Sequence, residues 1–193
     1  IIDAVESLGG KIEGKNGSFP LAFNASISGG KVNIDGSLSS QFLTGLLMAL
    51  PCAPNDSHIV VRNLVSKPYV VLTLEILEDF GIEIDSNQQL TEFSIRGGQN
   101  YEQIEAAIDG DWSSAAALAV AGMLCAEQSL EIDGLNSQYT QADEAIRGAL
   151  LFAGGALSGT ETGIQVAKRP VRGFSVDLTD SPDLFPVLCA LAS

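Results

Sequence analysis

The feature that most constrains the fold is a long internal repeat. The segment Ile34–Ser40 (IDGSLSS) returns later in the chain as Ile108–Ser114 (IDGDWSS). A second echo, at nearly the same offset, joins Asn63–Ser66 (NLVS) to Gly134–Ser137 (GLNS). The repeating unit of about 70 residues is longer than the periods typical of short solenoid repeats. The sequence therefore predicts a subdomain that the chain uses more than once.

Each complete copy has the pattern of a βαβαββ unit. A strand ending in Asp-Gly precedes an apolar helix, a short alternating strand and a second helix that stops at glycine, the usual residue after a helix end. Two further strands close each copy. The expected helices cover residues 41–50, 70–80, 115–125 and 142–152, and the expected later strands cover 57–61, 82–84, 93–95, 129–132, 156–157 and 163–166. The fold class is therefore α/β (α+β).

Partial copies flank the two complete ones. A third copy is expected to begin with a strand at Phe174–Asp177, and Ile1–Ile12 resembles the tail of an earlier copy whose helix ends at Gly9-Gly10. The chain begins without methionine or a signal peptide and ends in an apolar segment, so we expect a piece of a longer protein. We place the domain boundary and a hinge near Ile108, after the polar loop Gly97–Asn100. The predicted domains are residues 1–108 and 109–193.

Composition excludes several classes of function. Ten basic and 24 acidic residues give a net charge of −14, which repels nucleic acid. The longest apolar runs, Phe42–Leu50 and Ala115–Ala126, fall short of the ~18 residues that cross a membrane. Three cysteines without CxxC spacing predict reduced, mostly buried thiols in the cytoplasm. No metal-binding, dinucleotide-binding or Walker pattern is present, so we expect neither a metal nor a cofactor.

Paired serines begin the first helix of each complete copy. Ser39 and Ser40, like Ser113 and Ser114, place hydroxyl groups beside the free N–H groups of a helix start, which suits a phosphate or carboxylate. The alternative is that these serines only cap their helices. Gln41 follows the first pair and is suited either to orienting a polar substrate or to an ordinary first helical turn.

Two further motifs precede helices and also have two interpretations. Ser66-Lys67-Pro68-Tyr69 is either an anion-binding turn or a plain helix start with proline in the first turn. Asp180-Ser181-Pro182-Asp183 offers two carboxylates before an apolar helix. One is explained by capping, and the other is a candidate general base.

These motifs, in this order, resemble the 5-enolpyruvylshikimate-3-phosphate synthase family. The resemblance rests on DGSLSSQFLT (35–44), SKPY (66–69), GDWSSA (110–115) and DSPD (180–183) and spans essentially the whole chain. It implies the enolpyruvyl transferase fold, an inside-out α/β barrel of two domains with three βαβαββ units each, of which this chain would hold an incomplete part. The implied reaction transfers the enolpyruvyl group of phosphoenolpyruvate to the 5-hydroxyl of shikimate 3-phosphate.

The resemblance also implies roles for individual residues. Ser39, Ser40 and Ser66 would hold the shikimate phosphate, with Tyr69 supporting them. Gln41 would reach the shikimate ring and the enolpyruvyl group, and Asp183 would take the proton from the 5-hydroxyl. The implied partners are the two small-molecule substrates, without nucleic acid or membrane, and the full-length enzyme would be a cytoplasmic monomer.

Two alternative functions and the activity of the isolated chain complete the expectations. The sister family, UDP-N-acetylglucosamine enolpyruvyl transferase, shares the fold but is not expected to combine SSQ (39–41) with SKPY (66–69). A non-catalytic repeat scaffold would use the serines only as caps and Asp183 only as surface charge. None of the ten cations matches the family's cationic phosphoenolpyruvate positions, so we expect the 193 residues alone to be inactive.

Overall fold

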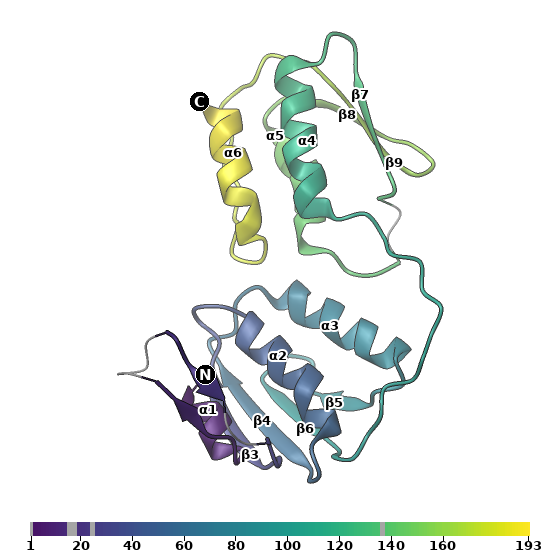
Figure 1. Ribbon diagram of the computed structural model, residues 1–193. Helices are drawn as coiled ribbons and strands as arrows, with labels where there is room; N and C mark the ends of the chain where they lie inside the picture. The colour runs from purple at the N-terminus through teal and green to yellow at the C-terminus, as the bar shows by residue number, and fades with distance from the viewer. Residues whose placement is uncertain (1, 15–18, 24–25, 136–137) are drawn as a thin grey trace. The chain divides into compact units, whose positions relative to one another are not determined.

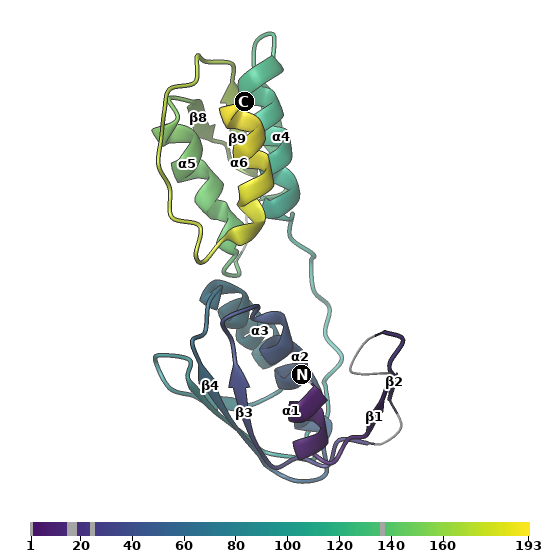
Figure 2. The same ribbon diagram turned by 90° about the vertical axis from the view of Figure 1, so that its left-hand side faces the viewer.

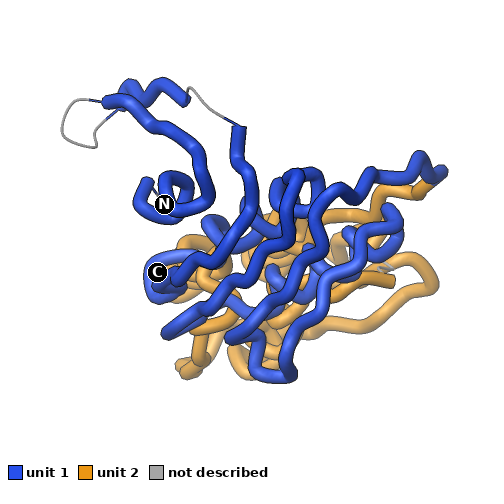
Figure 3. Tube along the Cα trace, turned by 90° about the horizontal axis from the view of Figure 1, so that it is seen from below, with its two compact units in different colours: residues 1–105 blue, residues 106–193 orange. Residues whose placement is uncertain are grey.

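The computed structural model describes residues 2–14, 19–23, 26–135 and 138–193. The chain divides into two compact units, unit 1 with residues 1–105 and unit 2 with residues 106–193, coloured blue and orange in Figure 3. Each unit has its own hydrophobic core.

Unit 1 is built around a mixed four-stranded sheet with helices on one face (Figure 1). The strand order is β3-β4-β6-β5, in which β3 and β4 are parallel and the other pairs are antiparallel. The strands are β3 (Lys31–Asp35), β4 (Ser57–Arg62), β5 (Ile84–Ser86) and β6 (Glu92–Ile95), and the helices that cover them are α2 (Gln41–Ala49) and α3 (Lys67–Asp79). The chain order β3-α2-β4-α3-β5-β6 confirms the predicted βαβαββ order for the first copy.

Alternation along the strands of unit 1 explains which face the helices cover. Ile59 and Val61 on β4 are buried, as are Phe93 and Ile95 on β6. Successive side chains of a strand point to opposite faces, so these four lie on the helix-covered face. Leu43, Leu46 and Leu47 of α2 complete the same core.

The N-terminal segment of unit 1 contains a short helix, α1 (Ile2–Ser7), followed by the paired strands β1 (Ile12–Glu13) and β2 (Ala22–Phe23). The helix ends before Gly9, whose φ of +91° is a conformation that glycine adopts at little cost. A Cβ at Gly9 would also lie 2.4 Å from the Ser28 hydroxyl oxygen. The expected helix end at Gly9-Gly10 is confirmed.

Unit 2 has helices on one face of a three-stranded antiparallel sheet of order β7-β9-β8 (Figures 1 and 2). Its core includes the fully buried Met123, Ile146 and Leu150. In chain order the elements are α4 (Trp112–Cys125), β7 (Leu130–Asp133), the 3-10 turn η3 (Ala142–Ala145), α5 (Ile146–Phe152), β8 (Ala156–Gly159), β9 (Gly163–Ala167), η4 (Pro182–Leu184) and α6 (Phe185–Ala192).

Two expected strands do not form. Residues 101–111 contain no strand, and Ile108 is 93% exposed, so the second copy lacks the first strand of the unit. The segment Glu105–Ile108 has no alternation of apolar residues that could bury one face. Residues 174–177 are also not a strand, although Phe174 and Val176 pack on the core of unit 2. The alternation there is real, but no neighbouring strand among the described residues supplies a hydrogen-bonded ladder.

The expectation of mostly buried cysteines is wrong. Cys52, Cys125 and Cys189 are free and all exposed. Cys125 shows why the pattern misled: α4 is apolar at nearly every position, so its sequence does not distinguish the buried face from the outer one. Leu118 of the same helix is 52% exposed.

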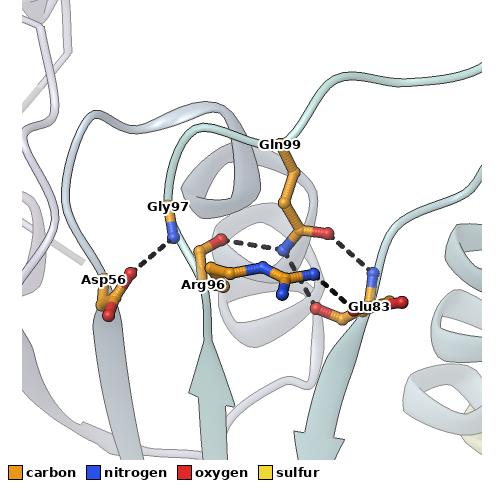
Figure 4. Close-up of polar contacts among 5 residues, drawn as sticks. All are labelled: Asp56, Glu83, Arg96, Gly97 and Gln99. Carbon is orange, nitrogen blue, oxygen red and sulfur yellow. Dashed lines mark hydrogen bonds and ion pairs between the residues drawn. The ribbon is translucent and has the colours of Figure 1, made fainter.

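The polar loop after β6, where we expected the connection between domains to begin, is fixed to unit 1 (Figure 4). The amide nitrogen of Gln99 donates to the carbonyl oxygens of Glu83 and Arg96, at 3.0 and 2.8 Å, and its carbonyl oxygen accepts from the Glu83 N–H at 2.8 Å. Arg96 pairs with the Glu83 carboxylate, and the Gly97 N–H donates to Asp56. The Glu102 N–H still donates to a carbonyl of unit 1. The loop itself is therefore part of unit 1.

Among the described residues, no helix combines the length and apolar character needed to cross a membrane.

Candidate functional site

The candidate site of unit 1 lies where the two parallel strands of its sheet end side by side. Asp35, the last residue of β3, and Arg62, the last of β4, are paired across the ladder. Because parallel strands end at the same edge of a sheet, the loops that lead from them into α2 and α3 are neighbours. The first loop carries Ser39 and Ser40, and the second carries Ser66.

The first loop supports both interpretations of its serines. The hydroxyl oxygen of Ser39 accepts the N–H of Gln41 at 3.1 Å, so Ser39 does cap α2. Ser40 is only 4% exposed and makes no capping hydrogen bond with its side chain. Gln41 is the exposed first residue of α2. Ser40 and Gln41 thus remain candidates for contact with a ligand.

The second loop has an unusual backbone at Ser66. This buried residue has φ +55° and ψ +42°, a left-handed conformation that costs a non-glycine residue roughly 1–2 kcal/mol. Its side chain makes no capping hydrogen bond, although Pro68 in the first turn of α3 agrees with a helix start. Tyr69 is half-buried, and its N–H donates to the Ser66 carbonyl at 3.2 Å. A strained, buried serine is typical of a functional position.

Asp35 stands at the start of the first loop. Its carboxylate accepts the Ser37 N–H at 3.0 Å. This hydrogen bond is the main cause that holds the pKa of Asp35 below its usual range, with smaller contributions from the Ser37 hydroxyl and the Asn63 side chain. The group therefore remains an acceptor in neutral solution.

A hollow of about 440 Å³ opens beside this carboxylate, lined by Asn33, Ile34, Asp35, Arg62 and Asn63. Arg62 and Asp35 bring opposite charges to its lining. Neither Arg62 nor Asn63 belongs to the candidate site residues predicted from the sequence motifs. For Asn63 a signal existed, because Gly134 takes the matching place in the second copy, and both residues have positive φ, +53° and +82°.

In unit 2, a carboxylate occupies the corresponding helix start. Asp111 precedes α4 and accepts the N–H groups of Ser113 and Ser114 at 3.1 and 2.9 Å, together with the Ser114 hydroxyl. The Ser113 hydroxyl donates to the buried carboxylate of Asp143. The anion-cradle interpretation is therefore wrong for Ser113 and Ser114, whose polar groups are bound internally. Ser37 is the residue of unit 1 that corresponds to Asp111, and its side chain has no carboxylate.

Replacement of Asp111 by alanine (Asp111→Ala) is expected to destabilise unit 2 by about 0.5–2 kcal/mol, because two helix N–H groups lose their acceptor. The hydrogen bond from the Ser114 hydroxyl, the largest cause, lowers the pKa of Asp111 from its ordinary value of 3.8. Its contribution to stability is therefore complete above about pH 4 and is lost as pH falls through the lowered pKa. Urea unfolding followed by tryptophan fluorescence measures unit 2 selectively, since Trp112 is the single tryptophan and is buried there.

The control for this prediction is Glu127→Ala, which removes an exposed acidic side chain just beyond the other end of α4. We expect it to change stability by less than about 0.5 kcal/mol. Equal effects of the two substitutions would show that charge, and not the cap, is responsible.

Asp183 belongs to unit 2. It is exposed in η4, just before α6, and follows the buried Ser181. Asp180 is also exposed and precedes the turn. The structure thus brings Ser39, Ser40, Gln41, Ser66 and Tyr69 to two neighbouring loops of unit 1 and the helix starts that follow them, and places Asp183 in the other unit. Among the described residues, no group of three or more His, Cys, Asp or Glu side chains is arranged to hold a metal ion.

Comparison with known proteins identifies the family. The family profile of EPSP synthase (3-phosphoshikimate 1-carboxyvinyltransferase) matches residues 1–193, the whole chain. The chain belongs to the EPSP synthase family.

Curated relatives with the name 3-phosphoshikimate 1-carboxyvinyltransferase agree with this assignment. The protein of Methanocorpusculum labreanum is 32% identical over 194 residues, covering 100% of this chain and 45% of the relative. That of Clostridium kluyveri is 37% identical over 180 residues, covering 93% and 42%.

Solved structures confirm the enolpyruvyl transferase fold expected for EPSP synthase. EPSP synthase from Acinetobacter baumannii superposes with a TM-score of 0.67 at 19% identity, covering 98% of this chain and 45% of that one. The enolpyruvyl transferase NikO from Streptomyces tendae gives 0.68 at 17% identity, covering 98% and 47%. The chain therefore spans a little under half the length of the EPSP synthase relatives it matches.

Proposed function

We propose that this chain supplies the shikimate 3-phosphate-binding part of a 3-phosphoshikimate 1-carboxyvinyltransferase. The observation that supports the proposal most is the pair of adjacent loops after β3 and β4, which carry serine hydroxyls at two helix starts. Helix N-termini and hydroxyl groups bind phosphate without a large counter-charge. The names of the curated relatives favour this activity over UDP-N-acetylglucosamine enolpyruvyl transfer and over a non-catalytic scaffold.

In this proposal Ser39, Ser40 and Ser66 donate hydrogen bonds to the phosphate of shikimate 3-phosphate. Tyr69 supports Ser66 from the first turn of α3. Gln41, exposed at the first position of α2, contacts the shikimate ring and the enolpyruvyl group. The left-handed backbone of Ser66 is then a strained conformation kept for the phosphate.

Asp183 acts as the general base. It accepts the proton of the 5-hydroxyl as that oxygen forms a bond to C2 of phosphoenolpyruvate. C3 of phosphoenolpyruvate takes up a proton to give a tetrahedral intermediate. Loss of that proton from C3 and of phosphate from C2 then gives 5-enolpyruvylshikimate 3-phosphate and inorganic phosphate. The overall reaction is balanced without an oxidant or a metal.

We infer the remaining properties from family membership. The chain holds parts of two domains, 1–108 and 109–193, of a cytoplasmic enzyme that is monomeric at full length. Its partners are shikimate 3-phosphate and phosphoenolpyruvate.

The proposal is tested with the isolated chain itself. We expect weak but saturable binding of shikimate 3-phosphate in NMR titrations, with the largest shifts at the serine loops of unit 1, and no enolpyruvyl transfer in a phosphate-release assay. Shikimate without the phosphate is the control ligand and should bind more weakly. A folded chain that does not distinguish the two ligands would refute the proposed phosphate site, and appreciable turnover would refute the expectation that these residues are incomplete as a catalyst.

A further inference from the structure

We propose that Tyr101 is a positioning residue for the loops of unit 1 that carry Ser39, Ser40 and Ser66. It joins the C-terminal ends of α2 and α3, the two helices that follow these loops, and so sets how far apart the helix starts lie. The inference rests on the proposed function, because it concerns the loops that would hold the shikimate phosphate. Tyr101 itself is not proposed to touch the substrate.

The first support is the contact of Tyr101 with both helices. Its hydroxyl donates to the carbonyl oxygen of Met48, in the last turn of α2, at 2.6 Å. Its ring lies edge-on to that of Phe80, the C-cap residue of α3, with the ring centroids 6.3 Å apart. This is a favoured geometry for two aromatic rings. One side chain therefore joins the ends of two helices.

The neighbouring backbone gives the second support. The Glu102 N–H donates to the Phe80 carbonyl at 2.8 Å, and the Gln99 N–H donates to the Pro51 carbonyl, just beyond α2, also at 2.8 Å. A helix leaves its last carbonyl groups without partners of its own, and a proline that follows it has no N–H to offer them. Residues 99–102 therefore supply donors to the carbonyl groups at both helix ends.

The helices can transmit a shift from one end to the other. They lie side by side on the same face of the sheet (Figure 1) and share one core. The nine residues of α2 and the thirteen of α3 span roughly 13 and 20 Å at about 1.5 Å per residue. Each helix is held by its own backbone hydrogen bonds and moves as a rod. Release of the C-terminal ends would therefore let Ser40 and Ser66 move relative to each other.

Unit 2 shows which part of this arrangement belongs to the repeat. After β9, the Arg169 N–H donates to the Met123 carbonyl of α4 at 3.4 Å, and the Arg172 N–H donates to the Ala153 carbonyl after α5 at 2.9 Å. The Arg172 side chain also donates to a carbonyl of α5. This segment, residues 168–173, contains no tyrosine. The backbone contacts are a property of the repeat, whereas Tyr101 adds a side-chain link between both helices in the unit with the proposed ligand loops.

The experiment measures binding and stability of the isolated chain separately. Tyr101→Ala removes the hydrogen bond to Met48 and the contact with Phe80, and should raise the Kd for shikimate 3-phosphate about five- to tenfold. Tyr101→Phe removes the hydrogen bond alone, so we expect a rise of about threefold. NMR titration gives the Kd, and urea unfolding gives the free energy of unfolding.

The ordinary alternative is that Tyr101 only stabilises unit 1. A chain that is less stable but still folded keeps its Kd, because almost every molecule remains competent to bind. A positioning role also predicts that the amide resonances of Ser40 and Ser66 shift in both variants without ligand, although these residues lie at the other ends of the helices. If Tyr101→Ala does not fold, Tyr101→Phe carries the test.

Phe23→Ala is the matched control. Phe23 is an aromatic residue on β2 of the same unit, 54% exposed against 41% for Tyr101, and it belongs to neither helix. We expect its replacement to leave the Kd within about 1.5-fold of the original. The resonances of Ser40 and Ser66 should also stay in place.

The outcomes separate this inference from the proposed function. No binding of shikimate 3-phosphate by the original folded chain overturns both. Binding by the original chain, together with an unchanged Kd in the folded Tyr101 variants, overturns only the role of Tyr101. A raised Kd without shifts at Ser40 and Ser66, or an equal rise in Phe23→Ala, also overturns that role.

Discussion

Replacement of Asp183 by asparagine (Asp183→Asn), in a chain of the relatives' length that contains these residues, is expected to lower kcat about 10²- to 10⁴-fold. That range is the usual contribution of a positioned general base. Asparagine keeps the size and polarity of the side chain but cannot accept the proton of the 5-hydroxyl. The KM for shikimate 3-phosphate should change by less than about threefold, because the groups that bind the phosphate are intact. Steady-state kinetics with both substrates varied measures the two effects.

The neighbouring carboxylate provides the control. Asp180→Asn removes an equally exposed acid from the start of the same motif, ahead of the same turn. We expect it to retain kcat within about threefold. Similar losses in both variants would indicate a general electrostatic effect of the DSPD segment. A nearly unchanged kcat in Asp183→Asn would eliminate Asp183 as the base.

Replacement of both Ser39 and Ser40 by alanine is expected to weaken shikimate 3-phosphate binding about 10²- to 10⁴-fold. Two hydrogen bonds to a charged phosphate, each of about 1.5–3 kcal/mol, would be lost. Ser39→Ala also removes the acceptor of the Gln41 N–H, so part of its effect is on the stability of α2. Ser40 makes no such bond with its side chain, and Ser40→Ala therefore isolates the contribution to binding. Titration of the isolated chain gives the Kd.

The internal repeat provides the control for these serines. Ser114 is the counterpart of Ser40 in the second copy, and its hydroxyl donates to Asp111. We expect Ser114→Ala to lower the stability of unit 2 slightly and to leave the Kd for shikimate 3-phosphate unchanged. If Ser40→Ala also left the Kd for shikimate 3-phosphate unchanged, Ser40 would have only a structural role.

Most helices and strands could be predicted from local sequence patterns, and packing in the folded chain did not alter them. The helix predicted for residues 41–50 is observed as α2 and a short 3-10 turn, and the alternation at 57–61 is observed as β4. The missing strands near Ile108 and Phe174 have different causes. Residues 105–108 lack an alternation of apolar side chains that could bury one face. Residues 174–177 have the alternation, but no neighbouring strand among the described residues pairs with them.

The site was predictable in part. The motifs located the loops after β3 and β4, and the helix starts behind them are confirmed. The sequence did not distinguish the two serine pairs, because their difference depends on Asp111, which folds back onto the N–H groups of α4. The left-handed backbone of Asn63, with φ +53°, was not predicted. The roles of Ser39, Ser40, Gln41, Ser66, Tyr69 and Asp183 in catalysis and binding stay predictions.

On the proposed function, the different starts of α2 and α4 would couple the stability of unit 1 to the supply of substrate. In unit 2 the negative group that completes α4 is part of the chain, so the start of this helix needs no dissolved anion. In unit 1 the corresponding negative group would arrive with the substrate, and a ligand that binds only the folded state stabilises it in proportion to the logarithm of its concentration. A shortage of shikimate 3-phosphate would then leave unit 1 as the first target for a protease, so the supply of substrate would govern how much of the enzyme persists.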